Sequence, residues 1–126
     1  MKLTKAEEHI MKILWNLGDA NVQDILNSFE DSRPARTTVA TVLSVLEKKG
    51  FVEHYPRGHI NYYHPLIEKT AYSRKQLSNI VKDYFNGSYT ALFSFFATES
   101  DLTLEDMDNI LRETRSNIEK EDSSQQ

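Results

Sequence analysis

Apolar residues recur three and four positions apart through the first fifty residues of the chain. This spacing predicts three amphipathic helices, at about residues 5–17, 22–29 and 35–49. Thr4 and Glu7 have the spacing of a capping box before the first helix, and Pro34 separates the second helix from the third. The stripes expected in the core are Ala6, Ile10, Ile13, Leu14 and Leu17, then Val22, Ile25, Leu26 and Phe29, and finally Val39, Val42, Leu43 and Leu46.

The pattern changes from helical spacing to alternation after Gly50. Residues 51–55 and 60–64 are rich in aromatic and β-branched side chains, which favours strands. The four residues between them, Pro56-Arg57-Gly58-His59, have turn chemistry and place a basic residue at the tip of a hairpin. Three helices followed by such a hairpin predict a winged helix-turn-helix domain over residues 1–66.

The rest of the chain returns to helical spacing. Its apolar stripes predict a long helix that ends before Gly87, a short helix after it, and a last helix that Thr103 caps. The predicted fold class is therefore mostly α, with a helical dimerisation domain at residues 67–119 and a disordered tail at 120–126. Because a segment of this size buries its apolar surface poorly alone, we expect a homodimer. The residues expected at the dimer interface are Leu77, Ile80, Tyr84, Leu92, Phe93, Phe96, Met107, Ile110 and Leu111.

The polar face of the third predicted helix is unusual. Short hydroxyl side chains and a lysine occupy it, and Glu47 is the only acid in residues 33–50. A solvated helix face usually mixes Glu with Lys, whereas Ser and Thr are mediocre helix formers. Hydroxyl groups without nearby negative charge suit contact with phosphates and base edges, so we expect double-stranded DNA as a partner, with a bland solvated surface as the alternative. The residues expected at DNA are Arg36, Thr37, Thr38, Thr41, Ser44, Lys48 and Arg57.

Charge is distributed unevenly along the chain. The formal net charge of -4 by itself argues against a nucleic-acid binder. However, residues 33–75 carry eight basic and three acidic side chains, whereas residues 99–122 carry nine acidic and three basic ones. The middle of the chain is thus suited to face a polyanion, and the acidic end is left for a different role.

Composition and motifs disfavour several other classes of function. The chain has no cysteine, which excludes disulfides, thiol catalysis and cysteine-based zinc sites. It has no nucleophile elbow, phosphate-binding loop or His-Glu-x-x-His pair, so we expect neither an enzyme nor a cofactor. His54 and His64 share numerical parity on the expected strands, but a third ligand is lacking and we expect no metal site. No apolar run reaches the ~18 residues of a membrane span, which predicts a cytoplasmic protein without membrane insertion.

Several motifs together resemble one known family. Thr4-Lys5-Ala6-Glu7, the run from Thr38 to Gly50, and Tyr63-His64-Pro65-Leu66 after the hairpin are similar to those of the BlaI/MecI penicillinase-repressor family. The resemblance is close over residues 3–66 and extends as a pattern over 67–118. It implies a dimeric winged-helix repressor of bacterial transcription, in which Thr38 and Thr41 belong to the recognition helix and Arg57 lies at the wing tip.

The resemblance also implies a mode of induction. In this family a membrane sensor metallopeptidase leads to cutting of the repressor in its dimerisation domain, next to a phenylalanine that follows asparagine. The nearest match in this chain is Ser94-Phe95, in which serine replaces the asparagine. The copper-responsive branch of the family uses C-terminal cysteine ligands, which this chain lacks.

Two other functions remain open from the sequence. The phenylalanine-rich helices around Phe93, Phe95 and Phe96 could admit a small molecule, which would make the protein a ligand-responsive winged-helix regulator. The winged helix could instead serve as a protein-interaction module that binds through its hairpin. A measurement of DNA binding separates the protein-interaction module, which would not bind DNA, from the repressor and the ligand-responsive regulator.

Overall fold

The structure is a computed structural model that describes residues 2–124. The chain forms two compact units, which meet along the sequence between Gln76 and Leu77. Helix α4 (Lys69–Tyr84) begins in the first unit and ends in the second.

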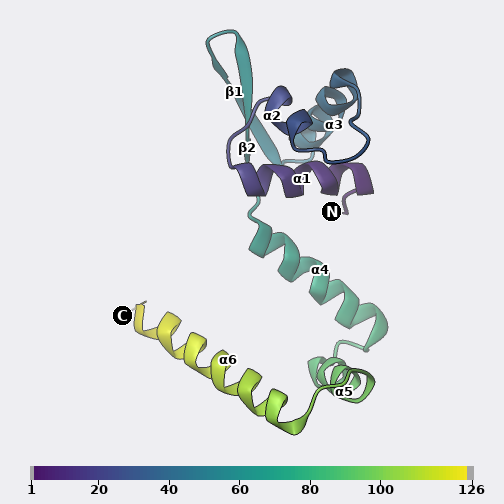
Figure 1. The fold of residues 1–126 in the computed structure, drawn as a ribbon, viewed down its shortest axis with the longest axis vertical. Coiled ribbons are helices and arrows are strands. Elements are labelled where there is room, and N and C mark those ends of the chain that lie inside the picture. Colours follow the sequence, from purple (N-terminus) through teal and green to yellow (C-terminus); the bar gives the residue numbers. More distant parts are fainter. Residues whose placement is uncertain (1, 125–126) are drawn as a thin grey trace. The chain divides into compact units, whose positions relative to one another are not determined.

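The first unit is a winged helix. α1 (Lys5–Leu17), α2 (Val22–Asn27) and α3 (Arg36–Lys48) precede an antiparallel hairpin of β1 (Val52–Arg57) and β2 (Ile60–Pro65). Figure 1 shows the three helices gathered together and the hairpin projecting from them as the wing. The predicted fold class, mostly α with a winged helix-turn-helix and further C-terminal helices, is confirmed.

The core of this unit lies between the three helices and the base of the wing. The predicted stripe of α1 is wrong at both ends, because Ala6 and Leu17 are exposed, and it omitted Met11, which is fully buried. Met11 shares one side of the helix with Ile10 and Leu14, so the buried face is rotated from the predicted one. The buried side chains include Ile10, Met11, Ile13 and Leu14 of α1, Ile25 and Leu26 of α2, Val39, Leu43 and Leu46 of α3, and Phe51 and Val52 at the base of the wing.

Polar side chains determine where the first two helices begin. Thr4 and Glu7 form a reciprocal capping box at α1, and Asn21 and Asp24 form another at α2. The buried carboxylate of Glu7 also accepts hydrogen bonds from Lys49 Nζ, at 2.7 and 2.9 Å. This contact with Lys49 lowers the pKa of the Glu7 carboxyl group. An ionised pair therefore joins α1 to the end of α3.

The wing has a tighter turn than the sequence suggested. Arg57 pairs with Ile60, so the turn consists of Gly58 and His59 alone. Gly58 has φ +67°, and a glycine with positive φ at the first turn position is typical of a type II′ turn. Pro56, expected in the turn, lies inside β1 next to the pair that closes it. Successive pairs of an antiparallel ladder alternate between hydrogen-bonded and non-hydrogen-bonded. The pair next to the closing pair is a non-hydrogen-bonded one, so its residue in β1 needs no N–H group and can be proline.

The first two turns of α4 pack on the winged helix. Tyr72 is buried against the rings of Trp15 and Phe51, with centroid distances of 5.5 and 6.2 Å, and its hydroxyl donates to Glu8 at 2.9 Å. Trp15 Nε1 donates to the carbonyl oxygen of Ile67 at 2.8 Å. The first compact unit therefore continues beyond residue 66, where we expected the winged-helix domain to end.

The second unit contains the end of α4, α5 (Tyr89–Glu99) and α6 (Leu104–Ser124). Val81 is buried, and the rings of Phe85 and Phe95 meet edge to face with centroids 5.6 Å apart. Residues 120–124, expected in a disordered tail, continue helix α6, and residues 125 and 126 of that tail lie outside the described residues. Among residues 2–124, no helix is both long enough and apolar enough to cross a membrane.

Candidate nucleic-acid interface

The residues of α3 that the sequence predicts at DNA are all exposed. The opposite side of this helix carries Val39, Leu43 and Leu46, which are buried in the core. Val45 borders the exposed side and is 36% exposed, so it adds an apolar group that the sequence prediction did not include. The exposed side carries Thr37, Thr38, Thr41, Ser44 and Lys48, and Arg36 is exposed in the first turn, where it contacts α2.

α3 begins without a capping side chain. Ala35 occupies its cap position, whereas α1 and α2 begin with capping boxes and Ser88 caps α5. The first turn of α3, which the structure describes in full, contains no acidic residue. The positive end of the helix dipole and the first backbone N–H groups are therefore available to an anion. The sequence prediction missed this feature, although alanine before Arg36 is its signal.

Helix α2 holds the first-turn arginine of α3. An Nη atom of Arg36 donates to the side-chain oxygen of Gln23, whose own amide donates to Asn27 at 2.9 Å. All three side chains are exposed. This polar row lies on the two helices of the helix-turn-helix, the first of which crosses the DNA backbone in proteins with this motif.

Thr41 makes a hydrogen bond within its own helix. Its hydroxyl donates to the carbonyl oxygen of Thr37 at 2.9 Å. The hydroxyl oxygen can still accept a hydrogen bond from a donor outside the helix, such as the amino group of a base. In this conformation Thr41 is therefore suited to act as an acceptor.

Arg57 is stacked along the wing. Its guanidinium carbon lies 4.6 Å from the ring centroid of Tyr62, and Tyr62 stacks on Tyr55 with centroids 6.1 Å apart and planes 21° apart. The Tyr55 hydroxyl donates to Asp19, in the turn after α1, and Nδ1 of His64 lies 2.6 Å from the same carboxylate. The hydrogen bonds from Tyr55 and from His64 lower the pKa of Asp19. The wing arginine is thus part of a connected group of side chains.

The wing histidines do not converge on one site. The register pairs Glu53 with His64 and His54 with Tyr63, which places the two histidines on opposite faces of the hairpin. The shared face inferred from their numbering is wrong, because the two-residue turn pairs odd-numbered residues with even-numbered ones. His54 contacts Glu47 of α3 at 2.6 Å. In the part of the chain that the structure describes, no group of three His, Cys, Asp or Glu side chains is arranged to hold a metal ion.

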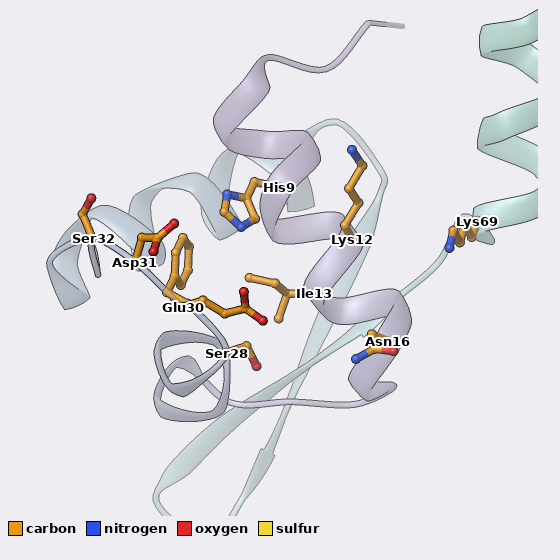
Figure 2. Close-up of a pocket in the computed structure, with 10 residues that line it drawn as sticks. His9, Lys12, Ile13, Asn16, Ser28, Glu30, Asp31, Ser32 and Lys69 are labelled. Atoms are coloured by element: carbon orange, nitrogen blue, oxygen red, sulfur yellow. The ribbon is translucent and has the colours of Figure 1, made fainter.

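A separate hollow of about 750 Å³ lies between α1 and the loop that follows α2. Figure 2 shows that His9, Ile13 and Asn16 face it from α1. Its lining mixes charges of both signs, and none of the described residues that we predict at DNA contributes to it. The charged lining residues are Lys12, Glu30, Asp31 and Lys69. The hollow is therefore distinct from the exposed side of α3.

The residues predicted at the dimer interface lie in the second unit, and most are exposed in the single chain. Phe93 is 68% exposed and Leu111 is 65% exposed. Ser94 and Phe95, the predicted cleavage position, are exposed residues inside α5. The exposed members of the interface set are Leu77, Ile80, Tyr84, Phe93, Phe96, Ile110 and Leu111, and the half-buried members are Leu92 and Met107.

Comparison with known proteins agrees with this arrangement. The model of the penicillinase repressor family matches residues 3–115, which reach from the start of the winged helix into α6. The chain belongs to this family. Family membership confirms the resemblance inferred from the sequence motifs.

Individual relatives of the penicillinase repressor family match most of the chain. The methicillin resistance regulatory protein MecI of Mammaliicoccus sciuri is 26% identical over 114 residues, which cover 87% of this chain and 93% of that protein. The penicillinase repressor of Bacillus licheniformis is 24% identical over 123 residues, which cover 95% and 96%. The solution structure of the DNA-binding domain of the repressor BlaI matches with 28% identity and a TM-score of 0.50, over 56% of this chain and 88% of that domain.

Proposed function

We propose that this member of the penicillinase repressor family binds promoter DNA as a homodimer and thereby represses transcription. The observation that carries the proposal is the exposed side of α3, where hydroxyl and basic side chains follow a helix start without a cap. In a helix-turn-helix the second helix lies in the major groove, and its N-terminal residues contact base edges. α3 is that second helix here, since it follows α2 in the winged helix.

The polar residues of this surface divide between two tasks. Short hydroxyl side chains reach base edges and nearby phosphate oxygens, and they carry the sequence preference. Basic side chains contact the phosphates and supply the salt-dependent part of the affinity. The residues with hydroxyl side chains are Thr37, Thr38, Thr41 and Ser44, and the basic residues are Arg36, Lys48 and Arg57.

The second unit forms the dimer interface in this proposal. None of the described residues of α5 is buried in the single chain, although this helix carries Phe93, Phe95 and Phe96. A contiguous apolar surface exposed to water is unfavourable, and a second copy related by two-fold symmetry removes it from water on both chains. The dimer presents two α3 helices to two half-sites of an operator.

Binding to the DNA upstream of the protein's own gene tests the proposal. Arg36→Ala and Lys48→Ala each remove one phosphate contact, so each is expected to weaken binding and to lower the slope of log K against log salt by about one unit. Lys12→Ala is the matched control, because it removes an equal charge from an exposed site on α1. Fluorescence anisotropy titrations at several salt concentrations measure these slopes.

The possible results of these titrations separate the competing functions. Equal slopes for the wild type and all three variants would contradict the proposed docking face. No binding by the wild type at low salt would contradict the proposed function and favour a winged helix that binds protein.

The second part of the proposal concerns release of the operator. A membrane sensor metallopeptidase leads to cleavage of the chain between Ser94 and Phe95, and the cut chain releases the DNA. Both residues are exposed, but Thr98 Oγ1 donates to the carbonyl oxygen of Ser94 at 3.0 Å within the helix. Cutting therefore requires local opening of α5. We expect mass spectrometry of induced cells to detect a fragment that ends at Ser94. Derepression with intact protein that a small molecule stabilises would instead support a ligand-responsive regulator.

A further inference from the structure

Four side chains on one face of the wing form a connected row with Asp19 of the helical body. The register places Tyr55 opposite Tyr62, and alternation along the strands places Arg57 and His64 on the same face. Asp19, in the turn between α1 and α2, contacts Tyr55 and His64. The row therefore connects the body of the winged helix to the basic residue beside the wing turn.

We propose that Tyr62 is a positioning residue for Arg57, and that Tyr55 and Asp19 hold Tyr62 in the orientation that this task requires. The inference rests on the proposed function, because it concerns the contact of Arg57 with the DNA backbone. Tyr62 itself acts through Arg57 and makes no contact with DNA in this proposal.

The geometry of the guanidinium group makes the two contacts of Arg57 compatible. The group is planar, and its N–H donors point outward within that plane. The guanidinium carbon lies over the Tyr62 ring, 4.6 Å from its centroid, so the ring contacts the group from one side. The donors at the edge remain available to a phosphate. Stacking also restricts a flexible side chain before binding, which reduces the conformational entropy lost on the DNA.

Asp19 anchors the other end of the row. Its carboxyl group is ionised at neutral pH, and hydrogen bonds from Tyr55 and His64, assisted by the charge of Arg57, lower its pKa below the ordinary value of 3.8. The phenol of Tyr55 keeps its proton at neutral pH and remains a donor, and the hydrogen bond to Asp19 raises its pKa above the ordinary value of 10.0. Tyr55 is thereby held in place, and its ring supports Tyr62 across the strand pair.

A double-mutant cycle tests the proposal with the DNA upstream of the protein's own gene as the probe. Tyr62→Leu removes the aromatic face, whereas Tyr62→Phe keeps it and is the matched control. Tyr62→Leu is expected to weaken binding roughly two- to five-fold, the range of a cation–π contact at an exposed site, and Tyr62→Phe to leave it within experimental error. In the Arg57→Ala background, Tyr62→Leu is expected to have no further effect.

The cycle separates a positioning role from its alternatives. Equal weakening by Tyr62→Leu in both backgrounds would overturn the proposal, since Tyr62 would then act independently of Arg57. Unchanged or stronger binding by Tyr62→Leu would also overturn it, because the stack would then be neutral or would compete with DNA. Failure of the wild type to bind the probe contradicts the proposed function itself.

The contact can also be measured in the protein without DNA. An arginine side chain above an aromatic ring experiences a ring-current shift, so the δ protons of Arg57 are expected upfield in the wild type and in Tyr62→Phe, and near their ordinary position in Tyr62→Leu. The backbone amide signals of the same protein report whether each variant is folded. Identical δ-proton shifts in all three folded proteins would overturn the proposal independently of any DNA measurement.

Discussion

At the scale of single residues, the carboxylate of Glu7 has two structural tasks. It accepts a hydrogen bond of 2.8 Å from the backbone N–H of Thr4 in the capping box of α1, and another of 2.7 Å from Lys49 Nζ. Only 5% of Glu7 is exposed, so water cannot easily replace these donors. Because Lys49 directly follows α3, the pair also holds the end of the proposed recognition helix against α1.

Replacing Glu7 with glutamine is expected to lower the free energy of unfolding by about 2 kcal/mol at neutral pH, because Lys49 loses its charged partner in a buried position. The pKa of Glu7 in the folded protein lies below its ordinary value of 4.5. The contribution of its ionised form is therefore complete above that value, and it is lost as the pH falls through the lower folded value.

Denaturant unfolding of the wild type and Glu7→Gln at neutral pH and at about pH 3 measures this difference. We expect the difference in stability between the two proteins to shrink in acid. A difference that stays constant with pH would show that the Glu7 charge is not involved.

At the scale of elements, the two-residue turn sets the geometry of the wing. Gly58 has φ +67°, and a Cβ atom added there would meet nothing within 4 Å. Gly58→Ala is therefore expected to destabilise the protein only through backbone strain, by about 1–2 kcal/mol. His59→Ala, at the second turn position, is the matched control and should change stability little. Thermal unfolding compares the two variants, and equal effects would contradict the assigned turn.

The sequence predicted those elements whose residues act locally, and it failed where the structure depends on contacts between distant residues. Apolar spacing and capping residues such as Thr4 are local, and they predicted the existence and order of the three helices and the hairpin. The extent of the hairpin turn and the buried face of α1 were predicted wrongly. The faces of the wing depend on register, where a shift of one residue exchanges the two sides. For this reason the prediction placed His54 and His64 on one face, and it did not find the row that joins Asp19 to Arg57. That row depends on a contact between residues far apart in the sequence.

The candidate DNA-binding surface was partly accessible from the sequence. The hydroxyl residues of α3 were identified because they lie opposite Val39, Leu43 and Leu46 on the same helix. The contact of Arg36 with Gln23 was not identified, since it depends on how α2 packs against α3. Periodicity therefore predicted which face of α3 is exposed, whereas the contacts that orient its side chains required the tertiary structure.

At the scale of the whole molecule, the proposed function depends on two copies of the chain acting together. Phe93→Glu places a charge on the apolar side of α5, at a residue that is 68% exposed and so is not needed to bury the core of one chain. We expect this variant to be monomeric in sedimentation experiments, because the charge would be buried at the dimer interface. Thr90→Glu adds the same charge to an exposed polar position of α5 and is the matched control.

The most direct test of the central claim is a DNase I footprint on the DNA upstream of the protein's own gene, compared among the wild type, Phe93→Glu and Thr90→Glu. The wild type and Thr90→Glu are expected to protect two half-sites of inverted sequence together, and Phe93→Glu to lose that joint protection at the same concentration. No footprint, or a single asymmetric site protected equally by all three proteins, would contradict a dimeric repressor that reads its operator with α3.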